Sequence, residues 1–178
     1  MSYHTIEESP FSHFLLANTK MAGLWLVVRL YLGWEWLQAG WGKLHNDAWV
    51  GENTGAALTG FVNNALAKTS GPHPDVQWWY AWFLEQVVLP NTETMSYVVA
   101  TGEFLVGAAL IVGFLVGVSA FFGMFMNFNF MLAGSVSINP IWFAIGIGLV
   151  LAWRIAGYYG LDYWVLPRLH RFLRPRRT

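Results

Sequence analysis

Long apolar stretches with few charged positions dominate the chain. Phe104 to Trp153 form a run of 50 residues without a single Asp, Glu, Lys or Arg. One helix of that length would extend about 75 Å, whereas the hydrocarbon core of a bilayer is about 30 Å thick. The run must therefore fold back, and Gly or Asn-Pro positions allow this at Gly113 to Gly117 and at Gly134 to Pro140.

These interruptions and an upstream apolar stretch predict an all-α integral membrane protein, a bundle of four transmembrane helices. The expected spans are Met21 to Gly40, Met95 to Leu115, Gly117 to Ala133 and Ile141 to Tyr159. The chain then divides into an N-terminal segment (1–20), a four-helix membrane domain (21–167) and a basic tail (168–178).

Positive charges orient the predicted bundle. The tail holds five arginines: Arg168, Arg171, Arg174, Arg176 and Arg177. The connection from Gln38 to Thr94 carries five acids and two lysines. Because basic residues favour the cytoplasmic side, we expect a multi-pass plasma-membrane protein with both termini in the cytoplasm. This orientation explains the tail, so no nucleic-acid partner is expected.

The outer connection, about residues 43–94, is expected to contain helices of its own. Gly55 to Lys68 has helical composition, and Val76 to Val88 concentrates aromatic rings such as Trp78, Trp79 and Trp82. Such rings prefer the headgroup level, which predicts amphipathic helices lying on the outer membrane face. The alternative, equally compatible with the sequence, is that the rings pack against the tops of the spans.

The composition excludes several kinds of redox site. The chain has 11% charged and 17% aromatic residues, no net charge and no cysteine, so it cannot form disulfides or supply thiolates to zinc or iron–sulfur clusters. All five histidines lie outside the predicted spans. We therefore expect no haem, iron–sulfur cluster or metal ligated by this chain.

Polar residues inside the predicted spans form the candidate site. They are Arg29, Glu35, Glu103, Asn127, Asn129 and Arg154. A charge at the bilayer centre costs at least about 2.5 to 3.5 kcal/mol on insertion scales, so each should face the bundle interior with a partner. From the helical rise, the two acids and two amides lie about 8 to 12 Å below the outer boundary, and the two arginines about 17 to 20 Å below it.

This arrangement predicts a polar cleft in the outer leaflet that suits a quinone. Glu103 and Glu35 are the candidate proton relay. The candidate hydrogen-bond donors and walls of the cleft are Arg29, Gln38, Asn127, Asn129, Arg154, Trp36 and Phe104. The two asparagines lie about 200° apart on a helix, so one should reach the cleft while the other bonds a neighbouring helix or chain. The alternative is that Glu–Arg pairs only fix the register of the helices.

Three motifs carry a resemblance to a known family. They are Arg29-x3-Gly33 leading into Gly40-Trp-Gly42-Lys43-Leu44, Gly102-Glu103-x3-Gly107-x5-Gly113, and Gly123-Met-Phe-Met-Asn127-Phe-Asn129-Phe. With these motifs the chain resembles the DoxX-like membrane proteins. With Trp153-Arg154-x-Ala156-Gly157 and the Trp-rich outer loop, it is most similar to the DoxD branch, the membrane subunit of thiosulfate:quinone oxidoreductase.

The resemblance implies a membrane oxidoreductase subunit that binds and reduces quinone during thiosulfate oxidation. It also implies a separate partner, a DoxA-like or other redox subunit, and a homo-oligomer is the alternative assembly. Two other functions stay open: a structural or assembly subunit of another membrane redox complex, and a small transporter. The transporter is disfavoured because the spans show no inverted repeat and no broken helix at mid-membrane.

Overall fold

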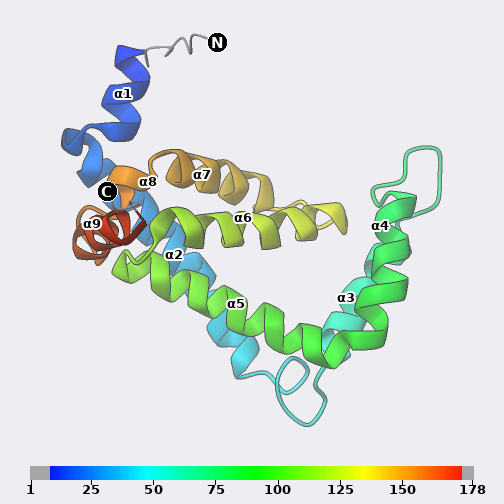
Figure 1. Ribbon diagram of the computed structural model, residues 1–178. Coiled ribbons are helices and arrows are strands. Elements are labelled where there is room, and N and C mark those ends of the chain that lie inside the picture. Colours follow the sequence, from blue (N-terminus) through cyan, green and yellow to red (C-terminus); the bar gives the residue numbers. More distant parts are fainter. Residues whose placement is uncertain (1–8, 174–178) are drawn as a thin grey trace.

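The predicted spans form helices in the computed structural model, which describes residues 9–173 (Figure 1). The four long helices are α2 (Ala22–Leu44), α5 (Thr92–Val112), α6 (Val116–Leu132) and α7 (Asn139–Leu151). Every regular element within residues 9–173 is helical, so the all-α prediction is confirmed for that part of the chain. The ends of the predicted cytoplasmic segments, residues 1–8 and 174–178, lie outside the described residues.

Shorter helices flank and connect the long ones. They are α1 (Pro10–Ala17), α3 (Ala56–Leu66), α4 (Trp78–Phe83), α8 (Trp153–Ala156) and α9 (Asp162–Leu173), with the 3-10 turns η1 (Thr19–Met21) and η3 (Leu89–Asn91) and the π-helical η2 (Leu84–Val88). The outer connection therefore contains helices, as its composition predicts. Their location on a membrane surface stays a prediction.

The turn between α5 and α6 is the tightest connection of the long helices. Gly113 ends α5 with φ 70°, and Leu115 precedes α6 with φ 44°. Glycine adopts the left-handed region without cost, whereas a leucine there needs support from its surroundings. The fold-back expected at Gly113 to Gly117 is thus confirmed.

The fourth predicted span is not one continuous helix. Its helix α7 ends at Leu151, and α8 resumes at Trp153. The break allows Trp153 to pack tightly on α6, where a methyl group added at Gly117 would lie 2.7 Å from the Trp153 Cβ atom. The fourth span expected from Ile141 to Tyr159 therefore consists of two helices with a break at Ala152.

Helical structure continues without interruption through α4, η2, η3 and α5. These 35 residues, Trp78–Val112, form the one helical run within residues 9–173 that is long and apolar enough to cross a membrane, by length and composition. The run bends between α4 and α5 (Figure 1), at the π-helical turn and Pro90, where the regular hydrogen-bond ladder is interrupted. Helices α6 and α7 are apolar but shorter, so four spans and their orientation stay a prediction.

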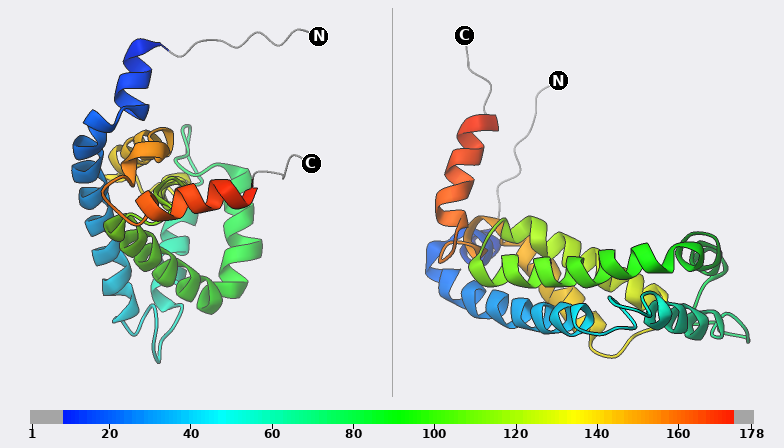
Figure 2. Two further views of the ribbon diagram at one scale, coloured as in Figure 1. Left: turned by 60° about the vertical axis from the view of Figure 1, so that its left-hand side comes forward. Right: turned by 90° about the horizontal axis from the view of Figure 1, so that it is seen from below.

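The long helices lie side by side, and α9 leaves their end across their direction (Figure 2). Helix α2 packs on α5, and α6 packs on α7. One core cluster, including Trp36, Leu110 and Leu149, fills the space between the long helices. A second cluster, including Leu58 and Val62, joins α3 and α4 to the near ends of α5 and α6.

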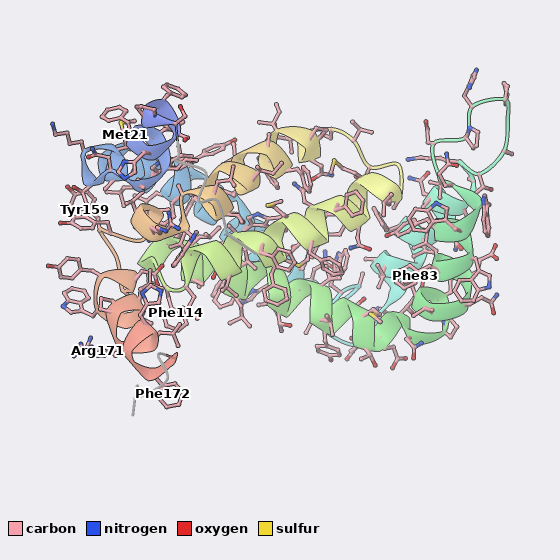
Figure 3. The ribbon with its side chains drawn as sticks, turned by 45° about the horizontal axis from the view of Figure 1, so that its top comes forward. Met21, Phe83, Phe114, Tyr159, Arg171 and Phe172 are labelled. Atoms are coloured by element: carbon pink, nitrogen blue, oxygen red, sulfur yellow. The ribbon has the colours of Figure 1, made fainter. Side chains whose placement is uncertain are left out.

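Apolar side chains also cover the outside of the long helices (Figure 3). Exposed examples are Val27, Trp34, Leu105, Phe121, Phe122 and Phe125. So many exposed large apolar side chains are unusual for a surface that faces water on all sides. They are expected on helices in contact with lipid.

Candidate functional site

Helices α2 and α5 form a close-packed interface, called the α2–α5 seam below. Gly40 lies directly on the backbone of Phe104, and Gly107 lies on the backbone of Leu37. No side chain fits at either glycine, because even a methyl group would overlap backbone atoms of the partner helix. The glycines of the first two motifs thus bring the backbones of α2 and α5 together.

A buried ion pair closes one end of the seam. The Lys43 ammonium lies 2.6 Å from Glu103 Oε2, and the Glu103 side chain is only 2% exposed whereas that of Lys43 is 22% exposed. The ammonium also lies 5.1 Å from the centre of the Trp49 ring. The sequence suggested Glu–Arg pairs and did not indicate Lys43 as the partner of Glu103, because the crossing of α2 and α5 is not visible in the sequence.

Arg29 closes the opposite end of the seam. This buried guanidinium donates hydrogen bonds to the carbonyl oxygens of Leu110 (2.9 Å), Ile111 (3.4 Å) and Tyr159 (3.3 Å). The first two carbonyls belong to the last turn of α5, whose acceptors lack partners within their own helix. Arg29 therefore ties the end of α5 to α2 and to the segment before α9.

The other predicted site residues are dispersed. Glu35 is half-buried and Gln38 is exposed on α2, and within the described chain neither side chain makes a hydrogen bond or ion pair. Trp36 is buried, with its ring centre 5.8 Å from that of Trp142. Phe104 is half-buried, and its ring centre lies 6.1 Å from that of Trp41. Exposed Arg154 stands over the Trp153 ring on α8.

The two asparagines of α6 contact different neighbouring helices, in agreement with their angular separation. Buried Asn127 donates through Nδ2 to the Asn139 carbonyl oxygen at the start of α7, at 2.8 Å. Asn129 faces the other way, where its carbonyl and Oδ1 oxygens accept hydrogen bonds from the Tyr80 hydroxyl at 2.9 and 3.2 Å. The side chain of Asn129 therefore connects α6 to α4.

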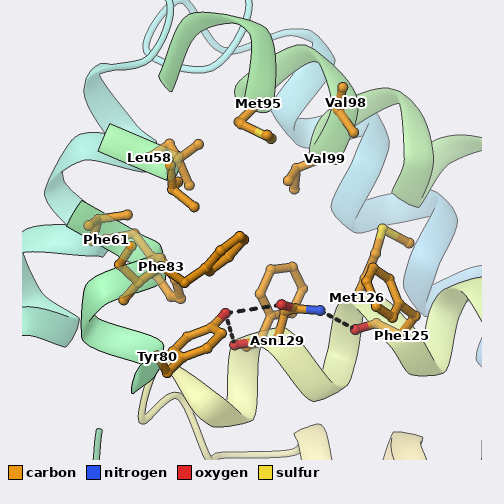
Figure 4. Close-up of a pocket in the computed structure, with 14 residues that line it drawn as sticks. Leu58, Phe61, Tyr80, Phe83, Met95, Val98, Val99, Phe125, Met126 and Asn129 are labelled. Carbon is orange, nitrogen blue, oxygen red and sulfur yellow. Dashed lines mark hydrogen bonds between the residues drawn. The ribbon is translucent and has the colours of Figure 1, made fainter. Parts of the chain in front are cut away.

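A cavity of about 280 Å³ lies between α3, α4, η2, α5 and α6 (Figure 4). Its walls are apolar and aromatic, except for Tyr80 and Asn129 at one edge. The lining residues are Leu58, Phe61, Val62, Tyr80, Phe83, Leu84, Val88, Met95, Val98, Val99, Phe125, Met126, Asn129 and Phe130. Of the predicted proton-relay residues and hydrogen-bond donors of the quinone cleft, this cavity includes Asn129 alone.

Sequence reasoning did not assign Tyr80 to a site. It lies within the aromatic run of the outer connection, which was interpreted as a membrane-surface helix. Tyr80 is only 4% exposed. The available sequence signal was a tyrosine among tryptophans, because its hydroxyl needs a hydrogen-bond partner when buried. No pattern in the sequence indicates that this partner is Asn129, 49 positions away.

Asp162 is a second residue that the sequence did not indicate. Its carboxylate accepts hydrogen bonds from the backbone N–H groups of Leu115 (2.6 Å) and Val116 (2.9 Å) at the start of α6. Burial raises the pKa of Asp162, and these two hydrogen bonds and the charge of Arg29 partly offset the increase. The carboxylate supports the left-handed backbone of Leu115 and satisfies N–H groups that a helix leaves free.

The helical architecture and the exposed apolar side chains are those expected of a helical membrane protein. The comparison with protein families agrees with this class, because the DoxX family model matches residues 24–135, more than half of the chain. The chain belongs to the DoxX family. The matched region contains the α2–α5 seam and every residue that lines the cavity. No curated protein and no solved structure gives a significant match.

Proposed function

We propose that this DoxX family protein is the quinone-binding membrane subunit of a thiosulfate:quinone oxidoreductase-type complex. The observation that carries the proposal is the cavity between α3 and α6, which combines aromatic walls with one hydrogen-bonding edge. In this proposal α2, α5, α6 and the α7–α8 segment cross the bilayer. Helices α3 and α4 then lie toward the outer face, and both termini lie in the cytoplasm.

The dimensions of the cavity suit the ring of a quinone better than a whole lipid. Its volume of about 280 Å³ lies just below the range of about 300 to 1,000 Å³ that is typical of small-molecule sites. Rings such as Phe61, Phe83 and Phe130 offer faces and edges for stacking. A hydrophobic tail would extend past the exposed Val98 and Phe125, which lie on the lipid-facing side of α5 and α6.

The polar edge supplies a donor for a quinone carbonyl. The Tyr80 hydroxyl donates to either oxygen of Asn129 in this structure, and the same O–H can rotate toward an acceptor in the cavity. The Asn129 amide group donates to the Phe125 carbonyl at 2.8 Å, which fixes its orientation. Tyr80 therefore acts as the hydrogen-bond donor, and Asn129 positions it.

Reduction of a quinone to a quinol requires two electrons and two protons. The chain has no cysteine, so the electrons come from sulfur oxidation on a separate partner, a DoxA-like or other redox subunit. Glu103 lies one helical turn from Val99 in the cavity wall, and half-buried Glu35 lies on the neighbouring helix α2. We assign proton delivery to these two acids, with Glu103 as the nearer one along α5.

Binding of a short-chain ubiquinone analogue to the purified protein tests this site. We expect Tyr80→Phe to weaken binding by about 2- to 12-fold, which corresponds to one hydrogen bond of about 0.5 to 1.5 kcal/mol. Tyr97→Phe is the matched control, because Tyr97 is exposed on α5 outside the cavity. Equal affinities of the two variants would remove Tyr80 from the site, and a protein that binds no quinone at all would overturn the proposal.

One observation favours a second function, that of a structural subunit of another membrane redox complex. The Lys43–Glu103 pair joins α2 to α5, and the Arg29 hydrogen bonds join α2 to α5 and to the segment before α9. Such contacts are expected of charges that fix the register of helices. In that case, replacing Lys43 and Glu103 together by Met and Leu preserves both assembly and quinone reduction in the reconstituted complex. Loss of quinone reduction with intact assembly supports proton transfer by Glu103.

A further inference from the structure

The two ends of the molecule carry opposite charges. Most of the acids among residues 9–173 lie at the end formed by α3, α4 and their connections: Asp47, Glu52, Asp75, Glu85 and Glu93. At the end formed by η1, α8 and α9, the exposed charges of the described residues are cationic: Lys20, Arg154, Arg168 and Arg171. The described acid at that end, Asp162, is 2% exposed and engaged with two backbone N–H groups.

Helix α9 presents part of this positive charge away from the body of the molecule. It runs across the direction of the long helices (Figure 2) and carries Arg171 and Phe172 at its far end (Figure 3). Arg168 donates from one Nη to the Trp164 carbonyl at 2.6 Å, and Arg171 donates from Nε to that of Pro167 at 3.3 Å. The remaining N–H groups of both side chains point to no described acceptor, and guanidinium groups bind phosphate oxygens strongly.

Aromatic rings border the same surface. Ring centres lie 5.2 Å apart for Tyr158 and Tyr159, 5.5 Å for Tyr158 and Tyr163, and 5.4 Å for Tyr163 and Trp164. All four rings are exposed. Rings with one polar atom favour the boundary between hydrocarbon and headgroups, so a membrane surface is the environment that suits this cluster.

An open hollow lies between Arg154 and these rings. It measures about 420 Å³ and is lined by Arg154, Tyr158, Asp162, Tyr163, Leu166 and Pro167. The exposed Leu169 and Phe172 lie further along α9, beside Arg168 and Arg171. A phosphate group next to acyl chains matches this combination of guanidinium groups, phenol hydroxyls and apolar side chains.

We propose that α8 and α9 form a binding surface for anionic phospholipids of one leaflet, with headgroup phosphates held by Arg154, Arg168 and Arg171. If the long helices cross the bilayer, α9 lies along its surface, because it runs across their direction. The charge complementarity identifies the occupant as an anionic lipid, since a zwitterionic headgroup offers no net attraction. This surface lies at the opposite end of the molecule from the Tyr80 cavity and does not depend on quinone binding.

Lipid selectivity of the purified full-length protein tests the proposal. The protein is equilibrated in detergent with phosphatidylglycerol and phosphatidylcholine of equal chain length, and the retained lipids are quantified by native mass spectrometry. We expect the unchanged protein to retain more phosphatidylglycerol than phosphatidylcholine. In R168Q/R171Q this preference should fall by about fivefold for each arginine removed, which corresponds to about 1 kcal/mol per basic residue. R168K/R171K is the matched control, because it preserves charge and should retain most of the preference.

Arg168 and Arg171 are the residues to change because their described hydrogen bonds reach only carbonyls of their own helix. The variants should therefore fold, which an unchanged elution volume and helical circular dichroism would verify. Equal retention of both lipids by the unchanged protein overturns the proposal. A preference of R168Q/R171Q for phosphatidylglycerol as strong as that of the unchanged protein also overturns it. So does displacement of the lipid by inorganic phosphate at a matching phosphate concentration, which would indicate a general anion site.

Discussion

The α2–α5 seam and the cavity between α3 and α6 share helix α5 but are built in opposite ways. In the seam, Gly40 and Gly107 bring backbones into contact, and charged side chains lie at its two ends: the Lys43–Glu103 pair at one and Arg29 at the other. In the cavity, aromatic and aliphatic side chains surround about 280 Å³ of space. One face of α5 is therefore close-packed against α2, while the adjoining face borders an empty cavity.

The difference indicates which residues serve the fold and which are available to a ligand. The family motifs of α2 and α5 meet each other in the seam, where Gly40 and Gly107 allow backbone contact and the Lys43–Glu103 pair and Arg29 join the two helices. The cavity instead depends on Tyr80 and Phe83, which the outer connection contributes from outside these motifs. Small-molecule chemistry is expected where space and a polar donor coincide, at the cavity.

The largest expected effect comes from adding one methyl group to the seam. Gly40→Ala places a carbon against the backbone of Phe104, which cannot move without separating α2 from α5. We expect a loss of at least about 3 kcal/mol in the free energy of unfolding, at the upper end of overpacking effects. Thermal unfolding in detergent measures it.

Gly42→Ala is the matched control for that substitution. It lies in the same helix, but a methyl group there meets no atom within 4 Å. Replacing an open helical glycine by alanine should stabilise the protein by up to about 1 kcal/mol. Equal unfolding temperatures of the two variants would show that the seam is not close-packed.

The ion pair at the end of the seam should have the next largest effect. Glu103→Gln removes the carboxylate that Lys43 contacts at 2.6 Å. We expect a loss of about 1 to 3 kcal/mol, because a buried group loses its partner while the partly exposed Lys43 retains access to water. A double-mutant cycle with Lys43→Met measures the coupling, and additive losses would mean that the pair contributes nothing to stability.

The helices were predictable from the sequence because uninterrupted hydropathy and punctuation by Gly and Pro are local signals. The turn at Gly113 and the boundaries of α6 follow from them directly. The break of the fourth predicted span at Ala152 accompanies a close contact between Trp153 and Gly117. That contact joins two helices, and hydropathy carries no information about it.

The candidate site was predictable only as a set of residue types. Charges in apolar helices indicate that partners exist, but not which ones, so the sequence suggested Glu–Arg pairs and did not indicate Lys43 as the partner of Glu103. That Asn127 and Asn129 contact different neighbours could be expected, because their angular separation depends only on helix geometry. That one of them reaches a quinone cleft stays a prediction. The Tyr80 contact could not be inferred, because it requires the bend at η2 that brings α4 over α6.

Filling the cavity should separate ligand binding from stability. Val99→Phe extends a wall residue into the empty space, so we expect a change of less than about 1 kcal/mol in stability together with loss of quinone-analogue binding. Leu105→Phe is the control, because Leu105 is 63% exposed on the outer side of α5. A large destabilisation by Val99→Phe, comparable with that of Gly40→Ala, would show that the two faces of α5 are equally packed.

The smallest expected effect is a pH dependence that arises near the Arg29 end of the seam. Burial raises the pKa of Asp162 in the folded protein, so between its ordinary value and this raised value the folded state binds more protons than the unfolded state. Stability should therefore increase as the pH falls through this interval, and the increase is lost as the pH rises. Thermal unfolding of wild type and Asp162→Asn across this pH range measures the difference.

The variant, which leaves one N–H of Leu115 or Val116 without its acceptor, should be less stable throughout and lack this contribution. A contribution of opposite sign would mean that the hydrogen bonds and Arg29 outweigh burial, and that Asp162 acts as a fully ionised partner of the seam.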